Sequence, residues 1–288
     1  MIAFAACEGL AGCAMAAIKK GACMQTTETS VELSLEAGVA TLTLNRPQRL
    51  NSFNPAMHQA LAAALDRLRD DVEVRVLVLT GAGRAFCAGQ DLSDRAVLPG
   101  QQAVDLGQSI EDYYAPLVRR LRDMPKPVIA AVNGVAAGAG ANIALACDLV
   151  IAARSARFTQ AFSKVGLMPD SGGSYWLPRL LGQARAMGLA LLAEPLPAEQ
   201  AEEWGLIWRC VDDEDFPAAV RQLAEQLAGG PTLAYARIKG ALQAAEDNSL
   251  EQQLRLERDT QRQLGFSADY REGVAAFLAK RPPCFQGK

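Results

Sequence analysis

Two glycine- and alanine-rich turns hold the backbone groups best suited to chemistry, and each follows an apolar run typical of a buried strand. The turns span residues 81–91 and 133–141. Neither contains a Gly-Lys-Ser/Thr phosphate loop or the G-x-G-x-x-G spacing of a dinucleotide site. Small residues let backbone N–H groups approach a ligand closely, and the second turn opens a helix whose dipole favours negative charge. The two turns could form an oxyanion hole, or could simply allow tight packing.

One carboxylate, Asp170, directly precedes a Ser-Gly-Gly run at residues 171–173. A carboxylate can transfer protons as a general acid/base. Asp directly before Ser-Gly-Gly and a helical run also suits a helix N-cap, so both interpretations stay open. Five apolar residues could surround the carboxylate and raise its pKa, or could belong to the core: Phe86, Phe162, Leu167, Met168 and Trp176.

The other reactive side chains exclude several mechanisms. Seven scattered cysteines form no C-x-x-C pair or metal-ligand spacing, which predicts no metal site and suits a reducing cytoplasm. Cys87 and Cys147 are expected to be small packing residues. The only histidine, His58, is expected to be exposed, and Ser-His-Asp or Cys-His chemistry would depend on it alone. Acid/base chemistry therefore falls to carboxylates.

The composition of the 288 residues is that of a soluble globular protein with one main core: half are hydrophobic, 21% are charged, and the net charge is -3. No Lys/Arg block is present, which disfavours binding to nucleic acid. Residues 1–23 are apolar, but Glu8 interrupts them and no basic segment precedes them, which disfavours a signal peptide or membrane span. Residues 1–30 are expected to be a disordered extension, or to reflect a natural start at Met24.

Apolar periodicity predicts the elements that must position these residues. Strands are expected over residues 31–35, 39–45, 74–80, 127–132, 148–153 and 206–211. Helices are expected over residues 55–70, 104–122, 139–147, 176–181, 184–192, 198–204, 216–228, 233–245, 250–264 and 268–280. The early alternation of strands and helices indicates a largely parallel sheet, and the later helices would cover the core or a neighbouring subunit.

Four ordered segments resemble the signature sequences of the enoyl-CoA hydratase/isomerase (crotonase) superfamily: residues 44–51, 86–92, 126–134 and 146–153. The resemblance covers residues 31–288. It implies an α/β fold with a ClpP/crotonase-like spiral of β-β-α units over residues 31–225. A helical C-terminal portion, residues 226–288, would then mediate oligomerisation and cover coenzyme A, and residues 1–30 would be an extension outside both.

The same resemblance implies roles for individual residues. The N–H groups of Ala88 and Ala139 would hold the thioester oxygen, and losing one such donor typically costs about 3 kcal/mol of barrier. Asp91 could order its turn by hydrogen bonding, or could simply begin the next turn. Contacts with coenzyme A would come from Arg49, Leu50, Ala88, Gly89, Gln90, Asp91 and, from an adjoining subunit, Lys280.

Departures from the hydratase pattern are informative. The positions of the two hydratase glutamates hold Asn142 and Phe162, neither of which can activate water by proton exchange. Asp170 stands where related isomerases and dehalogenases carry their catalytic aspartate. The resemblance therefore implies an enzyme with one acid/base, which suits isomerisation better than hydration.

Within the superfamily the likeness is greatest to the ring-1,2-epoxyphenylacetyl-CoA isomerases of phenylacetate degradation, notably over residues 161–173 and 204–213. These enzymes form oxepin-CoA and also move enoyl-CoA double bonds between the β,γ and α,β positions. The alternatives are a CoA-thioester lyase or a dehalogenase in which aspartate is the nucleophile, and an RNA-binding homologue, which would need a basic surface. The expected partner is an acyl-CoA substrate, with no nucleic acid, membrane, metal or separate cofactor, in a cytoplasmic homotrimer or homohexamer.

Overall fold

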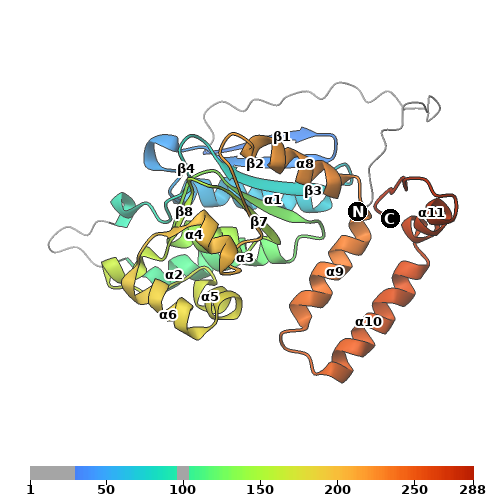
Figure 1. Cartoon of the computed structure of the whole chain (residues 1–288). Helices are drawn as coiled ribbons and strands as arrows, with labels where there is room; N and C mark the ends of the chain where they lie inside the picture. Colours follow the sequence, from blue (N-terminus) through green and yellow to red (C-terminus); the bar gives the residue numbers. More distant parts are fainter. Residues whose placement is uncertain (1–29, 96–103) are drawn as a thin grey trace.

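Two β-sheets form the centre of the protein (Figure 1), which we describe from a computed structural model covering residues 30–95 and 104–288. The larger sheet has the strand order β1-β2-β3-β5-β7-β10. The smaller sheet has the order β4-β6-β8-β9. The expectations for residues 1–29 fall outside the described residues.

The larger sheet begins with the predicted hairpin of β1 (Val31–Glu36) and β2 (Val39–Leu44). Ala37 and Gly38 have φ angles of 48° and 81°, as in the two-residue turns that match the twist of a hairpin. The remaining strands pair in parallel, which confirms the predicted parallel sheet: β3 (Val76–Gly81), β5 (Val128–Val132), β7 (Leu149–Ala153) and β10 (Arg209–Val211).

The smaller sheet lies partly within the segments that we interpreted as turns, and its strands were not predicted. They are β4 (Ala85–Cys87), β6 (Val135–Ala137), β8 (Arg157–Thr159) and β9 (Leu196–Pro197). Strands β3, β5 and β7 of the larger sheet are each followed by one strand of the smaller sheet. The chain therefore winds repeatedly through both sheets, which is the spiral that the resemblance implied.

Central strands of the larger sheet are buried on both faces. Val76 and Val78 belong to the apolar cluster beneath α8 (Phe216–Ala228), whereas Leu77 belongs to the cluster that contains α1 (Pro55–Asp70). Successive side chains of a strand point to opposite faces, so a strand between two helical layers is apolar throughout. This explains why these strands have continuous rather than alternating apolar sequences.

Most predicted helices are present, with shifted ends. The one expected over residues 104–122 is three consecutive pieces with a π-helical turn, and the strand expected over residues 206–211 is shortened to β10. Between α1 and α8, the α- and π-helices are α2 (Leu106–Ser109), η3 (Ile110–Tyr114), α3 (Ala115–Arg122), α4 (Ala139–Leu145), α5 (Gly173–Leu181), α6 (Gln183–Leu192) and α7 (Ala198–Glu203).

Three C-terminal helices form an arm that projects from the sheets (Figure 1): α9 (Thr232–Ala244), α10 (Leu250–Gly265) and α11 (Ala268–Leu278). The Lys239 ammonium ties α9 to the core, because it lies 2.9 Å from the Asp148 carboxylate and donates to the Leu121 carbonyl at 2.8 Å. Among the helices of the described ranges, none has the length and apolarity needed to cross a membrane.

Candidate active site

The two glycine-rich turns are in direct backbone contact. A Cβ on Gly140, in the first turn of α4, would lie 2.3 Å from the Cys87 carbonyl oxygen at the end of β4. Gly89 has a φ of +90°, and a Cβ on it would lie 3.4 Å from the Ala139 nitrogen. Only residues without side chains allow this approach. The fold therefore brings together the two predicted oxyanion turns, which lie about 50 residues apart in the sequence. This is expected where parallel strands end at the same edge of a sheet.

A third segment binds to the first turn through backbone hydrogen bonds. The Phe53 N–H donates to the Gly89 carbonyl at 2.7 Å, and the Asp91 N–H donates to the Phe53 carbonyl at 2.9 Å. The Ala88 N–H donates to the Leu50 carbonyl at 2.9 Å. The predicted coenzyme A segment around Leu50, which is half-buried beside the exposed Arg49, thus lies next to the predicted oxyanion turn.

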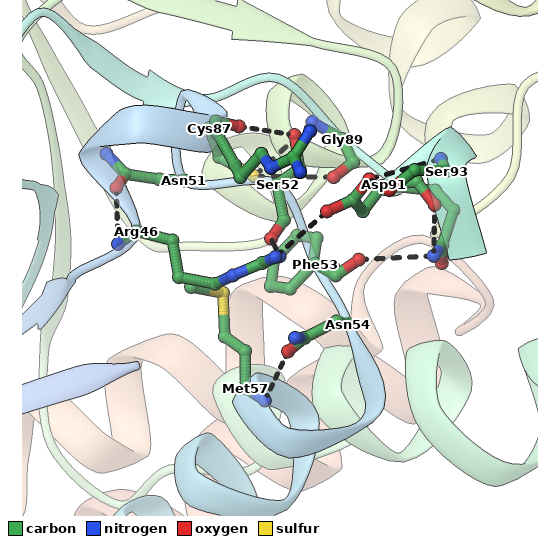
Figure 2. Close-up of polar contacts among 12 residues, drawn as sticks. Arg46, Asn51, Ser52, Phe53, Asn54, Met57, Cys87, Gly89, Asp91 and Ser93 are labelled. Atoms are coloured by element: carbon green, nitrogen blue, oxygen red, sulfur yellow. Dashed lines mark hydrogen bonds and ion pairs between the residues drawn. The ribbon is translucent and has the colours of Figure 1, made fainter. Parts of the chain in front are cut away.

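The buried Asp91 carboxylate stabilises the first glycine-rich turn, residues 81–91, through hydrogen bonds (Figure 2). It accepts from the Arg46 guanidinium at 2.9 Å and from the Ser93 hydroxyl at 2.6 Å. The Ser93 hydrogen bond and the Arg46 charge hold the pKa of Asp91 below its usual range, although burial opposes them. Arg46 also donates to the Ser52 carbonyl at 2.6 Å. These hydrogen bonds support the interpretation that Asp91 orders the turn. They keep the Asp91 carboxylate ionised and engaged by protein donors.

The Gln90 side chain also points into the structure. Its amide donates to the Phe53 carbonyl at 3.1 Å, and its oxygen accepts from the Tyr114 hydroxyl at 2.8 Å. Tyr114 lies in η3, so the π-helical turn is joined to the predicted oxyanion turn. The side chain of Gln90 therefore braces the turn, whereas our sequence analysis assigned this residue to ligand contact.

The two predicted oxyanion donors differ in the structure. The Ala88 N–H donates to the Leu50 carbonyl at 2.9 Å, so binding a thioester oxygen there would require that this hydrogen bond be exchanged or shared. Ala139 is the first residue of α4, where an N–H has no acceptor within the helix and the helix dipole is positive. The Ala139 N–H is therefore the better placed of the two for binding an oxyanion.

Asp170 does not cap a helix. Helix α5 begins at Gly173, its N-cap is Gly172, and no side chain accepts a capping hydrogen bond there. The half-buried Asp170 carboxylate instead accepts from the Ser171 hydroxyl at 2.9 Å. Burial raises the pKa of Asp170, and the Ser171 hydrogen bond opposes that rise. The capping interpretation is wrong, and a carboxyl group with a raised pKa is a better base than an ordinary one.

The first turn of α4 also holds the Asp170 segment. Asn142, which is fully buried, donates from its side-chain amide to the Asp170 carbonyl at 2.8 Å. Gln160 in turn donates to the Asn142 side-chain oxygen at 2.8 Å. The structure therefore brings Asp170 to the same helix terminus that begins at Ala139. Phe162 is buried beside that terminus, with its ring 3.8 Å from the place of a Cβ on Gly138.

Other predictions on the surroundings of Asp170 are met in part. Phe86 and Trp176 are buried, as a core or pocket residue should be. Leu167 and Met168 have exposed fractions of 45% and 67%, so neither belongs to the core. They follow the 3-10 helix η4 (Ala161–Val165) on a loop in which the Leu167 N–H donates to the Phe162 carbonyl at 3.0 Å.

His58 is buried, so the prediction that it is exposed is wrong. Its ring stacks between Phe53, at 4.8 Å between centroids, and Tyr113, at 5.1 Å. Cys87 and Cys147 are buried in the main apolar cluster, which confirms their packing role. Burial raises the pKa of the Cys87 thiol to about 12, which disfavours a thiolate nucleophile at Cys87 near neutral pH. Within residues 30–95 and 104–288, no cluster of His, Cys, Asp and Glu is suited to a metal ion.

Lys280 is not brought to the other site residues. It is exposed just beyond α11, and Figure 1 shows α11 at the opposite end of the molecule from α4. Sequence reasoning missed four residues that support the site: Arg46, Ser93, Gln160 and Ser171.

A helix N-terminus beside one carboxyl group of raised pKa has the groups that are needed to stabilise an enolate and to transfer a proton. Residues 34–288 match the family model described as enoyl-CoA hydratase/isomerase. The protein belongs to this family, whose fold and enzymatic character the structure shares.

Known relatives cover almost the whole chain. A 1,2-epoxyphenylacetyl-CoA isomerase of Escherichia coli is 63% identical over 254 residues, which are 88% of this chain and 97% of the relative. A 2,3-dehydroadipyl-CoA hydratase of the same organism is 36% identical, over 89% of this chain and 98% of its own. The crystal structure of an enoyl-CoA hydratase from Bacillus anthracis superposes with a TM-score of 0.82 at 30% identity, covering 90% of this chain and all of that one.

Proposed function

We propose that the protein converts ring-1,2-epoxyphenylacetyl-CoA to oxepin-CoA and moves the double bond of enoyl-CoA thioesters between the β,γ and α,β positions. The observation that carries this proposal is Asp170, whose pKa is raised and which lies at the helix terminus that begins with Ala139. The 63% identity to a 1,2-epoxyphenylacetyl-CoA isomerase supports the ring epoxide as substrate. Asn142 and Phe162, at the two hydratase positions, argue against hydration because neither exchanges protons near neutral pH.

In double-bond migration, Asp170 takes a proton from the carbon beside the thioester and returns it two carbons further along. The thioester becomes an enolate, and its oxygen is held by the Ala139 N–H, by the dipole of α4 and by the Ala88 N–H in exchange for the hydrogen bond to the Leu50 carbonyl. In the epoxide reaction, the same contacts hold the thioester while the ring rearranges in an apolar site. Coenzyme A is part of the substrate, so the scheme needs no separate cofactor.

The remaining contacts and the assembly belong to the same proposal. Arg49, Leu50 and the turn at residues 88–91 border coenzyme A, and Lys280 reaches it from an adjoining subunit of a cytoplasmic homotrimer or homohexamer. The C-terminal segment, residues 226–288, mediates that assembly. Support comes from large apolar side chains that the arm leaves exposed: Leu242, Leu250, Phe266, Phe277 and Leu278.

Three thioesters test the proposal with the purified protein: the ring epoxide, a β,γ-unsaturated acyl-CoA and a trans-2-enoyl-CoA. We expect turnover of the first two and no addition of water to the third, followed by absorbance and mass spectrometry. Hydration of the third at a rate comparable with isomerisation would contradict the assignment. Trapping an ester on Asp170 would assign the carboxylate as a nucleophile, as in a dehalogenase.

A further inference from the structure

We propose that Asn142 is a positioning residue, whose side-chain amide holds the turn that presents the Asp170 carboxylate. The inference rests on the proposed acid/base role of Asp170. It assigns a task to the residue that stands in place of a hydratase glutamate. Asn142 would act through the Asp170 backbone, not by contact with the substrate.

The Asp170 turn needs support because of its backbone conformation. The Gly173 N–H donates to the Asp170 carbonyl at 2.8 Å, which closes a four-residue turn. Its central residues, Ser171 and Gly172, have φ angles of 51° and 84°. The left-handed region costs free energy for a residue with a Cβ, so Ser171 adopts it only where neighbouring contacts enforce it.

Asn142 supplies such a contact in a defined orientation. Its amide nitrogen donates to the Asp170 carbonyl at 2.8 Å, and its oxygen accepts from Gln160 at 2.8 Å. The reverse orientation would place the Asn142 oxygen against the Asp170 carbonyl, with two acceptors facing each other. Gln160 is 4% exposed and Asn142 is fully buried, so water does not compete for these bonds.

The Asn142 side chain packs closely against the backbone of Gly173. A Cβ on Gly173 would lie 2.2 Å from the Asn142 amide nitrogen. A glutamate at position 142 would add a methylene and a negative charge in this space, facing the Asp170 carbonyl. A glutamate at this position would therefore lack the donor for the Asp170 carbonyl and would have to be accommodated against Gly173.

The Asn142→Asp variant tests the inference, because it keeps the size and the acceptor for Gln160 but replaces the donor that faces Asp170. At pH 8 we expect kcat for a β,γ-unsaturated acyl-CoA to fall by about 10- to 100-fold, since small displacements of a reacting group are costly. KM should change little, because the groups that bind the thioester remain. At lower pH the introduced carboxyl group becomes protonated and can donate, so the deficit in kcat should shrink.

Two further variants keep the test decisive. Gln160→Met removes the group that orients Asn142, and it should lower kcat less than Asn142→Asp, again with little change in KM. Asn51→Asp introduces a carboxyl group at another fully buried asparagine, one that donates to the Ala82 and Ala85 carbonyls, and its melting temperature gives the stability cost of such a group. If Asn142→Asp does not fold, Gln160→Met decides the question.

Asp170→Asn, measured in the same assay, separates the two proposals. One outcome would overturn the role of Asn142 alone. In it, Asp170→Asn is inactive, whereas Asn142→Asp is folded and has a kcat within about twofold of the parent. A deficit in Asn142→Asp that is equal at every pH would also overturn it. Parent-like activity of Asp170→Asn would overturn the proposed function and this inference together.

Discussion

The two sides of the candidate site are built on different principles. The glycine-rich turns offer backbone N–H groups, and direct contact between backbones holds them, as at Gly140 and Cys87. The opposite side offers one side chain, Asp170, on a strained turn held by the buried amides of Asn142 and Gln160. The first side should tolerate changes that preserve the backbone but not added atoms. The second should depend on the identity of individual polar groups.

Gly140→Ala should have the largest effect on stability. The new Cβ would meet the Cys87 carbonyl oxygen at 2.3 Å, and a backbone atom cannot rotate away. We expect a loss of about 3 kcal/mol in the free energy of unfolding, measured by urea denaturation. Gly188→Ala is the matched control: a Cβ there meets nothing within 4 Å, and a gain of about 0.5–1 kcal/mol is expected in this helix. Equal midpoints for the two variants would refute the close-contact argument.

Asp91→Asn should have the next largest effect, because it leaves the Arg46 guanidinium without its counter-charge. The two side chains are 8% and 16% exposed, so we expect a loss of about 1–2 kcal/mol at pH 7. The folded-state pKa of Asp91 is lowered, so this stabilisation is present above the unfolded value of about 4 and disappears as the pH falls through the folded value. Parent and variant should therefore converge in acid. Asp259→Asn, in an exposed ion pair, should change little, and an equal loss there would argue against a special role for Asp91.

Ser171→Ala tests the polar side of the comparison. It removes the hydroxyl that donates to the Asp170 carboxylate, so the pKa of Asp170 should rise further above its ordinary value. A base must be deprotonated, and the acidic limb of the kcat profile should therefore move to higher pH, with activity retained in alkali. A limb that stays in place or moves to lower pH would show that Asp170 is not the titrating group.

Ala139→Gly should have the smallest effect on catalysis, because the proposed donor is a backbone N–H that the change preserves. We expect kcat within about threefold of the parent and a stability loss of about 0.5–1 kcal/mol from glycine in a helix. Steady-state kinetics with the β,γ-unsaturated thioester would check this. A 100-fold loss of kcat would mean that the Ala139 methyl group, and not its amide, matters to the site.

An element could be predicted from the sequence when its apolar pattern extended over enough residues to show a period. The hairpin, α1 and the parallel strands have patterns of five or more residues, and those predictions are confirmed. Strands β4, β6 and β8 have three residues each, which is too short for a period, and so the second sheet was interpreted as loops.

The supporting contacts of the site could not be predicted from local patterns. Arg46 lies 45 residues before Asp91, and Asn142 lies 28 residues before Asp170, so only the fold brings each pair together. His58 was misjudged because nothing in the first helix reveals that Phe53 and Tyr113 enclose its ring. Asp170 and Ala139 emerged only through the likeness of whole segments to a family.

The most direct test of proton transfer by Asp170 compares the parent with Asp170→Asn on a β,γ-unsaturated acyl-CoA in heavy water. Conjugation is followed by absorbance and deuterium uptake by mass spectrometry. Since burial raises the pKa of Asp170, its charge does not favour folding at neutral pH, and the variant should unfold no more readily than the parent. We predict rapid isomerisation by the parent and a kcat lower by about 10³ in the folded variant. Equal rates in the two proteins would contradict the account.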